Sequence, residues 1–68
     1  MNITLNNKNE EIPGKDQLTV QELIEYKNFT FKLLVTKVNG ALVKKDKRDT
    51  AIIRDGDDVM VLHLVSGG

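Results

Sequence analysis

The sequence predicts an α+β fold in two layers, a mixed sheet of about five strands packed on one short helix. Runs typical of strands lie on both sides of a single amphipathic stretch, and one helix can cover only one face of the resulting sheet. With 68 residues and no cysteine, the chain has to build one small core without disulfides. We therefore expect residues 1–68 to form a single domain.

The first expected element is a β-hairpin. Residues 2–6 alternate polar and apolar side chains with a period of two, which is typical of a half-buried strand. The polar run Asn6–Asn9 is expected to turn, because asparagine tolerates positive φ. Residues 10–13 then return as a second strand. Pro13 places that strand at an edge of the sheet, because proline cannot donate a backbone hydrogen bond.

The second expected element is a short helix after residue 18. Thr19 and Glu22 have the spacing of a capping box, in which each side chain satisfies a backbone donor of the other residue. The helix is predicted to end near Asn28. Its apolar stripe, completed by the stem of Lys27, contains Val20, Leu23 and Ile24.

A second hairpin follows the helix. Residues 31–38 are predicted to form a long strand. The Asn39-Gly40 pair is a strong signal for a tight two-residue turn, and residues 41–43 return as a short strand.

Charged residues fill most of the connection to the last strand. Residues 44–50 are expected to form a solvated loop, and residues 51–53 add a small apolar patch. The acidic run 55–58 contains one glycine and is expected to turn the chain.

The last strand, residues 59–65, is apolar on both faces. By alternation, one face carries Val59, Val61 and His63. The other face carries Met60, Leu62 and Leu64. Since one helix covers only one face, the second face either meets a partner or lies under the loop of residues 44–54. We expect a partner surface; if Val59 and Val61 pack on the helix, the docking residues are Met60, Leu62, Leu64 and Val65.

Three other groups of polar residues are weighed as sites. The acidic turn, Asp55 to Asp58, lacks the ligand spacing of an EF-hand, so no metal site is predicted. The basic cluster Lys44–Arg48 contains no aromatic residue to stack bases, and we expect a solvated loop whose charges can steer a partner. His63 has only apolar neighbours in its strand and is assigned no chemistry. No catalytic side chain is predicted.

The charge balance restricts the partners further. Ten basic and ten acidic residues cancel, which gives no general attraction to nucleic acid or to an anionic membrane. No apolar run approaches the roughly 18 residues that span a bilayer, and the first residues do not resemble a signal peptide. The expected compartment is the cytoplasm.

The sequence ends on Ser66, Gly67 and Gly68. Without side chains, two glycines can thread a narrow channel and approach the active site of another protein closely. A carboxylate is a poor electrophile, so its use requires activation, typically by adenylation at a nucleotide-binding partner. We therefore expect a flexible tail over residues 66–68, with the Gly68 carboxylate as the attachment point.

Several motifs together resemble the ubiquitin-like sulfur-carrier proteins, and most closely the ThiS family of thiamin biosynthesis. The resemblance rests on a β-grasp order of elements and on the stretches "VNGALV", "RDGDDVMVL" and the final "GG". It covers essentially the whole chain and implies a β-grasp, ubiquitin-like fold.

The resemblance also implies a function. The protein would be a carrier, not an enzyme, monomeric on its own and without a bound cofactor. An E1-like partner of the ThiF type would adenylate Gly68 with ATP. A sulfur donor such as a cysteine desulfurase system would then supply the thiocarboxylate, whose sulfur goes to a thiazole synthase of the ThiG type.

Two departures from the family pattern leave the pathway open. Where members often carry Pro-Arg after the short strand, this chain has Lys44-Lys45, and it contains no tryptophan. The alternatives are a sulfur carrier like the small subunit of molybdopterin synthase and a ubiquitin-like protein modifier. A third is a β-grasp interaction module with an inert tail.

Overall fold

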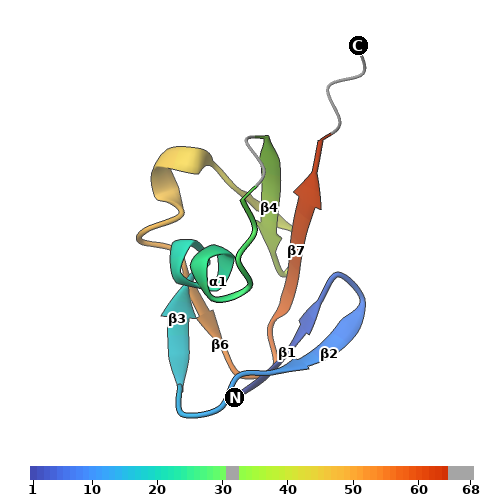
Figure 1. Ribbon diagram of the computed structural model, residues 1–68, viewed down its shortest axis with the longest axis vertical. Helices are drawn as coiled ribbons and strands as arrows, with labels where there is room; N and C mark the ends of the chain where they lie inside the picture. Colours follow the sequence, from blue (N-terminus) through green and yellow to red (C-terminus); the bar gives the residue numbers. More distant parts are fainter. Residues whose placement is uncertain (31–32, 65–68) are drawn as a thin grey trace.

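A computed structural model describes residues 1–30 and 33–64, and Figure 1 shows how the elements are arranged. In chain order they are β1 Asn2–Leu5, β2 Lys8–Glu11, β3 Gln17–Thr19, α1 Val20–Tyr26, β4 Leu34–Val38, β5 Ala41–Val43, the 3₁₀ helix η1 Lys45–Lys47, β6 Ile52–Arg54 and β7 Asp58–His63. Among these described residues, no helix is long and apolar enough to cross a membrane.

Five strands form the main sheet, in the spatial order β2-β1-β7-β4-β5. β1 and β7 run parallel, whereas the other neighbours run antiparallel, so the sheet is mixed. The predicted α+β architecture, with five strands and one short helix, is confirmed. β7, the last strand, lies at the centre of the sheet.

The first hairpin turns more tightly than predicted. Asn6 and Asn7 both have positive φ, 52° and 68°, so two residues suffice to reverse the chain. β2 therefore begins at Lys8, within the run predicted to be the turn, and it ends at Glu11 instead of reaching Pro13. β2 does lie at an edge of the sheet, as expected.

The helix begins and ends as its sequence predicts. Glu22 N–H donates to Thr19 Oγ1 at 3.0 Å, and Thr19 N–H donates to Glu22 Oε1 at 2.8 Å, which completes the capping box. At the other end, Asn28 takes a left-handed φ of 57°. The Asn28 and Phe29 N–H groups then bond to the Glu25 and Ile24 carbonyls, a Schellman motif.

The core lies between α1 and one face of the main sheet. We call this the inner face; it carries Val59 and Val61 of β7, and the opposite face is the outer face. The buried apolar residues are Ile3, Leu5, Ile12, Leu18, Val20, Leu23, Ile24, Ile53, Val59 and Val61. The helical stripe predicted from spacing is therefore the stripe that is buried.

The second hairpin has the predicted turn but a shorter first strand. Asn39 and Gly40 have φ values of 51° and 82°, as a tight two-residue hairpin turn requires. β4 begins at Leu34. Residues 31 and 32, which were predicted to belong to it, lie outside the described residues.

A second small sheet was not predicted. β3 pairs antiparallel with β6, and Leu18 lies opposite Ile53 in the register. The pairing turns the predicted apolar patch of residues 51–53 into a strand that fills the core beside α1. Each strand has only three residues, too few for a periodic pattern to be visible in the sequence.

The charged connection before β6 is not simply solvated. Its middle forms η1, and Arg48 turns its half-buried guanidinium toward β4. Arg48 Nη2 donates to the Leu34 carbonyl, and Nε donates to Thr36 Oγ1 at 3.2 Å. Thr36 is fully buried, and its hydroxyl donates to the Val43 carbonyl at 2.7 Å. Arg48 therefore fixes the connection to the sheet.

Candidate functional site

The predicted site combines the end of β7 with the residues that follow it. β7 is paired on both sides, with β1 and with β4. One residue beyond the end of β7, Leu64 N–H donates to the carbonyl of Leu33, the residue before β4, at 3.0 Å. The pairing between β7 and β4 therefore continues for one more residue on each strand. Val65, Ser66, Gly67 and Gly68 lie outside the described residues, and their predicted roles stay predictions.

The residue that follows β1 contacts β7 through its side chain. The Asn6 amide pairs with the backbone of Val61: Nδ2 donates to the Val61 carbonyl at 3.1 Å, and Oδ1 accepts from the Val61 N–H at 2.8 Å. The side chain thus continues the β1–β7 ladder after the Asn6 backbone has entered the turn. The sequence signalled a turn at Asn6, but nothing in it indicated this contact.

The two faces of β7 differ in their exposure to solvent. Val59 and Val61 are 0% and 6% exposed and belong to the core, so Met60 and Leu62 point to the outer face. Leu62 is 40% exposed and Leu64 is 50% exposed. Val59 and Val61 therefore lie on the buried face, which is the condition under which Met60, Leu62 and Leu64 were expected to dock a partner; the docking itself stays a prediction.

Neighbouring strands extend this apolar surface. In the register, Val35 lies opposite Leu62, and Lys37 lies between Met60 and Leu42. Leu33, which bonds to Leu64, and Leu42 are 51% and 59% exposed. We call this surface the apolar patch; it contains Leu33, Val35, Leu42, Met60, Leu62 and Leu64.

The charged loop does not cover the apolar patch. Gln21 N–H donates to the Arg48 carbonyl at 2.8 Å, and Val20 N–H donates to the Ala51 carbonyl at 3.0 Å. These bonds hold the loop beside the first turn of α1, next to which Figure 1 shows η1. The alternative that residues 44–54 fold over the second face of β7 is therefore wrong.

Polar residues fill the other end of the sheet. Asp57 accepts from the Arg54 N–H at 2.9 Å and from Asn39 Nδ2 at 3.1 Å, and Asp55 accepts from the Asn2 N–H at 2.6 Å. Two of these carboxylates thus stabilise the turn. Within residues 1–30 and 33–64, no group of acidic or histidine side chains is placed to hold a metal ion. His63 lies opposite Leu34 at the end of β7 and is exposed.

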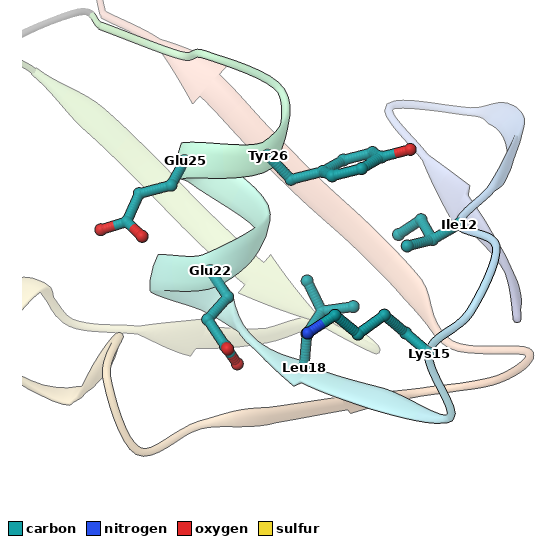
Figure 2. A pocket seen from close by; sticks show the side chains of 6 residues that line it. All are labelled: Ile12, Lys15, Leu18, Glu22, Glu25 and Tyr26. Atoms are coloured by element: carbon teal, nitrogen blue, oxygen red, sulfur yellow. The ribbon is translucent and has the colours of Figure 1, made fainter.

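A separate groove of about 350 Å³ lies on the helix side of the molecule. Figure 2 shows Tyr26 of α1 above Ile12, Leu18 and Lys15. The other lining residues are Glu22 and Glu25. The hydrogen bond from the Thr19 backbone N–H, aided by the Thr19 hydroxyl and by the charge of Lys15, lowers the pKa of Glu22. The groove was not predicted, because its walls come from residues that look like ordinary core and helix surface.

Comparison with known proteins gives a match that covers nearly the whole chain, including its last residues. The sequence pattern of the ThiS family matches residues 3–68. The chain belongs to the ThiS family. The matched range includes the outer-face residues of β7 and extends to Gly68.

Solved structures agree with this ThiS assignment. The crystal structure of the thiamine biosynthesis protein ThiS from Geobacter metallireducens has a TM-score of 0.90 and 29% identity, covering 100% of both chains. The solution structure of a thiamine biosynthesis protein from the same organism has a TM-score of 0.82 and 29% identity, covering 100% of this chain and 88% of that one. The predicted β-grasp fold and the resemblance to the ThiS family are confirmed.

Proposed function

We propose that this protein carries sulfur for the synthesis of the thiazole ring of thiamin, with the carboxylate of Gly68 as the attachment point. The match of the ThiS family over residues 3–68 is the observation that carries the proposal. The exposed apolar patch beside the end of β7 supports it, because a carrier needs a surface for the enzymes that act on it.

The chemistry takes place on the carrier's terminus and uses groups of the partner. The Gly68 carboxylate attacks the α-phosphate of ATP, which forms an acyl adenylate and releases pyrophosphate. The outer sulfur of a persulfide on a donor such as a cysteine desulfurase system then attacks the carbonyl carbon and displaces AMP, which leaves an acyl disulfide. A second thiol breaks the S–S bond of this acyl disulfide, so that the thiocarboxylate is released and the thiol forms a disulfide with the donor cysteine. An E1-like enzyme of the ThiF type is the proposed activator, and a thiazole synthase of the ThiG type is the proposed acceptor.

The apolar patch has a defined task in this scheme. Four residues, 65–68, separate Leu64 from the reacting carboxylate. Fully extended, four residues span at most about 14 Å. A partner that holds the patch therefore has to present its reaction centre within about 14 Å of Leu64. Docking and delivery of the terminus are thus coupled by the length of the chain.

Pyrophosphate exchange tests the activation step directly. The protein, the E1-like enzyme from the same genome, ATP and labelled pyrophosphate should give label in ATP only when the carrier is present. The variant that lacks Gly68 retains all of the described residues and serves as the matched control. Exchange that is equal with both carriers would contradict the proposal. Lysine-linked conjugates that depend on Gly68, without any thiocarboxylate, would favour a protein modifier instead.

A further inference from the structure

Charges are unevenly distributed along the chain, although they cancel overall. Residues 10–26 contain five acidic residues and one lysine. Residues 37–48 contain five basic residues and one aspartate. The acidic segment includes the end of the edge strand β2 together with β3 and α1, whereas the basic segment includes β5, at the opposite edge of the main sheet, and η1. We call these two regions the acidic side and the basic side.

The basic side includes the apolar patch and its border. Lys37 lies on the outer face, between Met60 and Leu42 in the register, and forms no ion pair with any described residue. Lys44 and Lys45 are exposed and directly follow β5, the edge strand beside β4.

The position of these lysines is fixed by the fold. Val43 lies opposite Thr36, so the chain reaches Lys44 at the level of Val35, where the apolar patch begins. Directly after η1, the Arg48 guanidinium points inward to Leu34 and Thr36 and is not part of the exposed charge. Arg48 instead holds the lysine-bearing segment at the edge of the sheet. We call Lys37, Lys44 and Lys45 the basic rim.

The acidic side lies over the other layer. Glu22 and Glu25 are exposed on α1, which covers the inner face of the sheet. Figure 2 shows both carboxylates at the helix surface, with Lys15 as the one cation among the residues drawn. The exposed carboxylates of α1 and the exposed Lys37 of the outer face therefore lie on opposite sides of the sheet.

We propose that the activating enzyme presents an apolar surface bordered by carboxylates, which meet the basic rim. The inference rests on the proposed function and specifies the chemistry of the partner. During encounter, the carboxylates of the activating enzyme attract the basic rim and repel the acidic residues of the helix. The carrier therefore approaches with its apolar patch and the end of β7 facing the enzyme. A second copy of this chain fits less well, because a symmetric pairing through the patch brings the two basic rims together.

Association kinetics with the E1-like enzyme from the same genome test this inference. The charge-reversed pair Lys44→Glu/Lys45→Glu changes the rim, and the pair Lys8→Glu/Lys15→Glu changes net charge equally at exposed positions outside it. At low salt, the rim pair should lower the association rate constant about tenfold or more, and added salt should reduce the difference. The control pair should change the rate much less.

The outcomes separate this inference from the proposed function. If wild-type carrier supports pyrophosphate exchange but both charge-reversed pairs associate at the same rate, the partner surface is not acidic and the inference fails alone. If the rim pair associates faster than the wild type, the inference fails in the same way. If the wild type supports no exchange, the proposed function fails as well. Should the rim pair unfold, Lys44→Gln/Lys45→Gln removes the charges without reversing them and is expected to slow association in the same direction.

Discussion

Asn6 does two things in one residue, since its backbone turns the chain while its side chain pairs with Val61. Replacement of Asn6 by glycine keeps the positive φ but removes both side-chain hydrogen bonds. We expect Asn6→Gly to lower the free energy of unfolding by about 1–2 kcal/mol. Asn7→Gly is the matched control: Asn7 shares the turn and the positive φ, and the change is expected to stay within about 0.5 kcal/mol. Urea titration measures both, and equal effects would contradict the role of the Asn6 amide.

Glu22 makes the start of the helix sensitive to acid. Its pKa lies below the ordinary value of 4.5, first because the Thr19 backbone N–H donates to the carboxylate. The folded state therefore favours the charged form, and the stabilisation is present above the ordinary pKa and is lost as pH falls through the folded one. Glu22→Gln keeps a capping side chain without the charge. The thermal midpoint of wild type should exceed that of Glu22→Gln near neutral pH, and the gap should close in acid; a gap that is independent of pH would contradict the assignment.

Local signals in the sequence were strongest where a single residue type decides the geometry. The capping box at Thr19 and the turn at Asn39-Gly40 were predicted correctly, because both depend on neighbours close in sequence. The Asn6–Val61 and Arg48–Thr36 contacts were not predicted. Their partners lie 55 and 12 residues away, and nothing in the local pattern indicates which distant backbone group a polar side chain will reach.

At the scale of elements, β7 contributes to the core through one set of alternate residues, and the proposed docking surface uses the other set. Leu62→Ala removes an exposed side chain of the apolar patch, and we expect affinity for the activating enzyme to fall about tenfold or more. Stability should change little. Val61→Ala is the matched control on the same strand: it should cost about 1–3 kcal/mol of stability because Val61 is buried. Calorimetric binding and urea unfolding separate the two effects. Loss of stability in Leu62→Ala without loss of affinity would contradict the division.

The elements also show why one pairing was missed and why the weaker alternative for the charged loop is wrong. The β3–β6 pair arises only because residues 17–19 and 52–54 meet in the fold, and neither segment is long enough to display a period. The loop of residues 44–54 was weighed as a cover for the outer face. Its hydrogen bonds to the first turn of α1 place it beside the helix instead. Both are tertiary effects of the helix and of β4, which the sequence of each segment does not encode alone.

For the whole molecule, the order of elements predicted the two-layer α+β architecture, and the resemblance to the ThiS family implied the β-grasp fold. The apolar character of β7 indicated that its second face is either exposed or covered by a partner. The reactive site, in contrast, was not predicted from the pattern of strands and helix. Among the described residues, no group of acidic or histidine side chains is placed to hold a metal ion, and the proposed site rests on residues 66–68 and on membership of the ThiS family. The uneven charge distribution could be interpreted only once the fold was known. The strand register places Lys37 beside Met60 and Leu42, and Lys44 and Lys45 directly follow the edge strand β5.

The intact mass of the carrier tests the central claim most directly. The protein is incubated with ATP, its E1-like enzyme, a cysteine desulfurase system, cysteine and a thiol reductant, and is then weighed by mass spectrometry beside the variant that lacks Gly68. The account predicts that the wild type gains the mass difference between sulfur and oxygen at its carboxyl terminus, whereas the variant gains nothing. A wild-type mass that stays unchanged while the same mixture catalyses pyrophosphate exchange would contradict the claim that Gly68 carries sulfur.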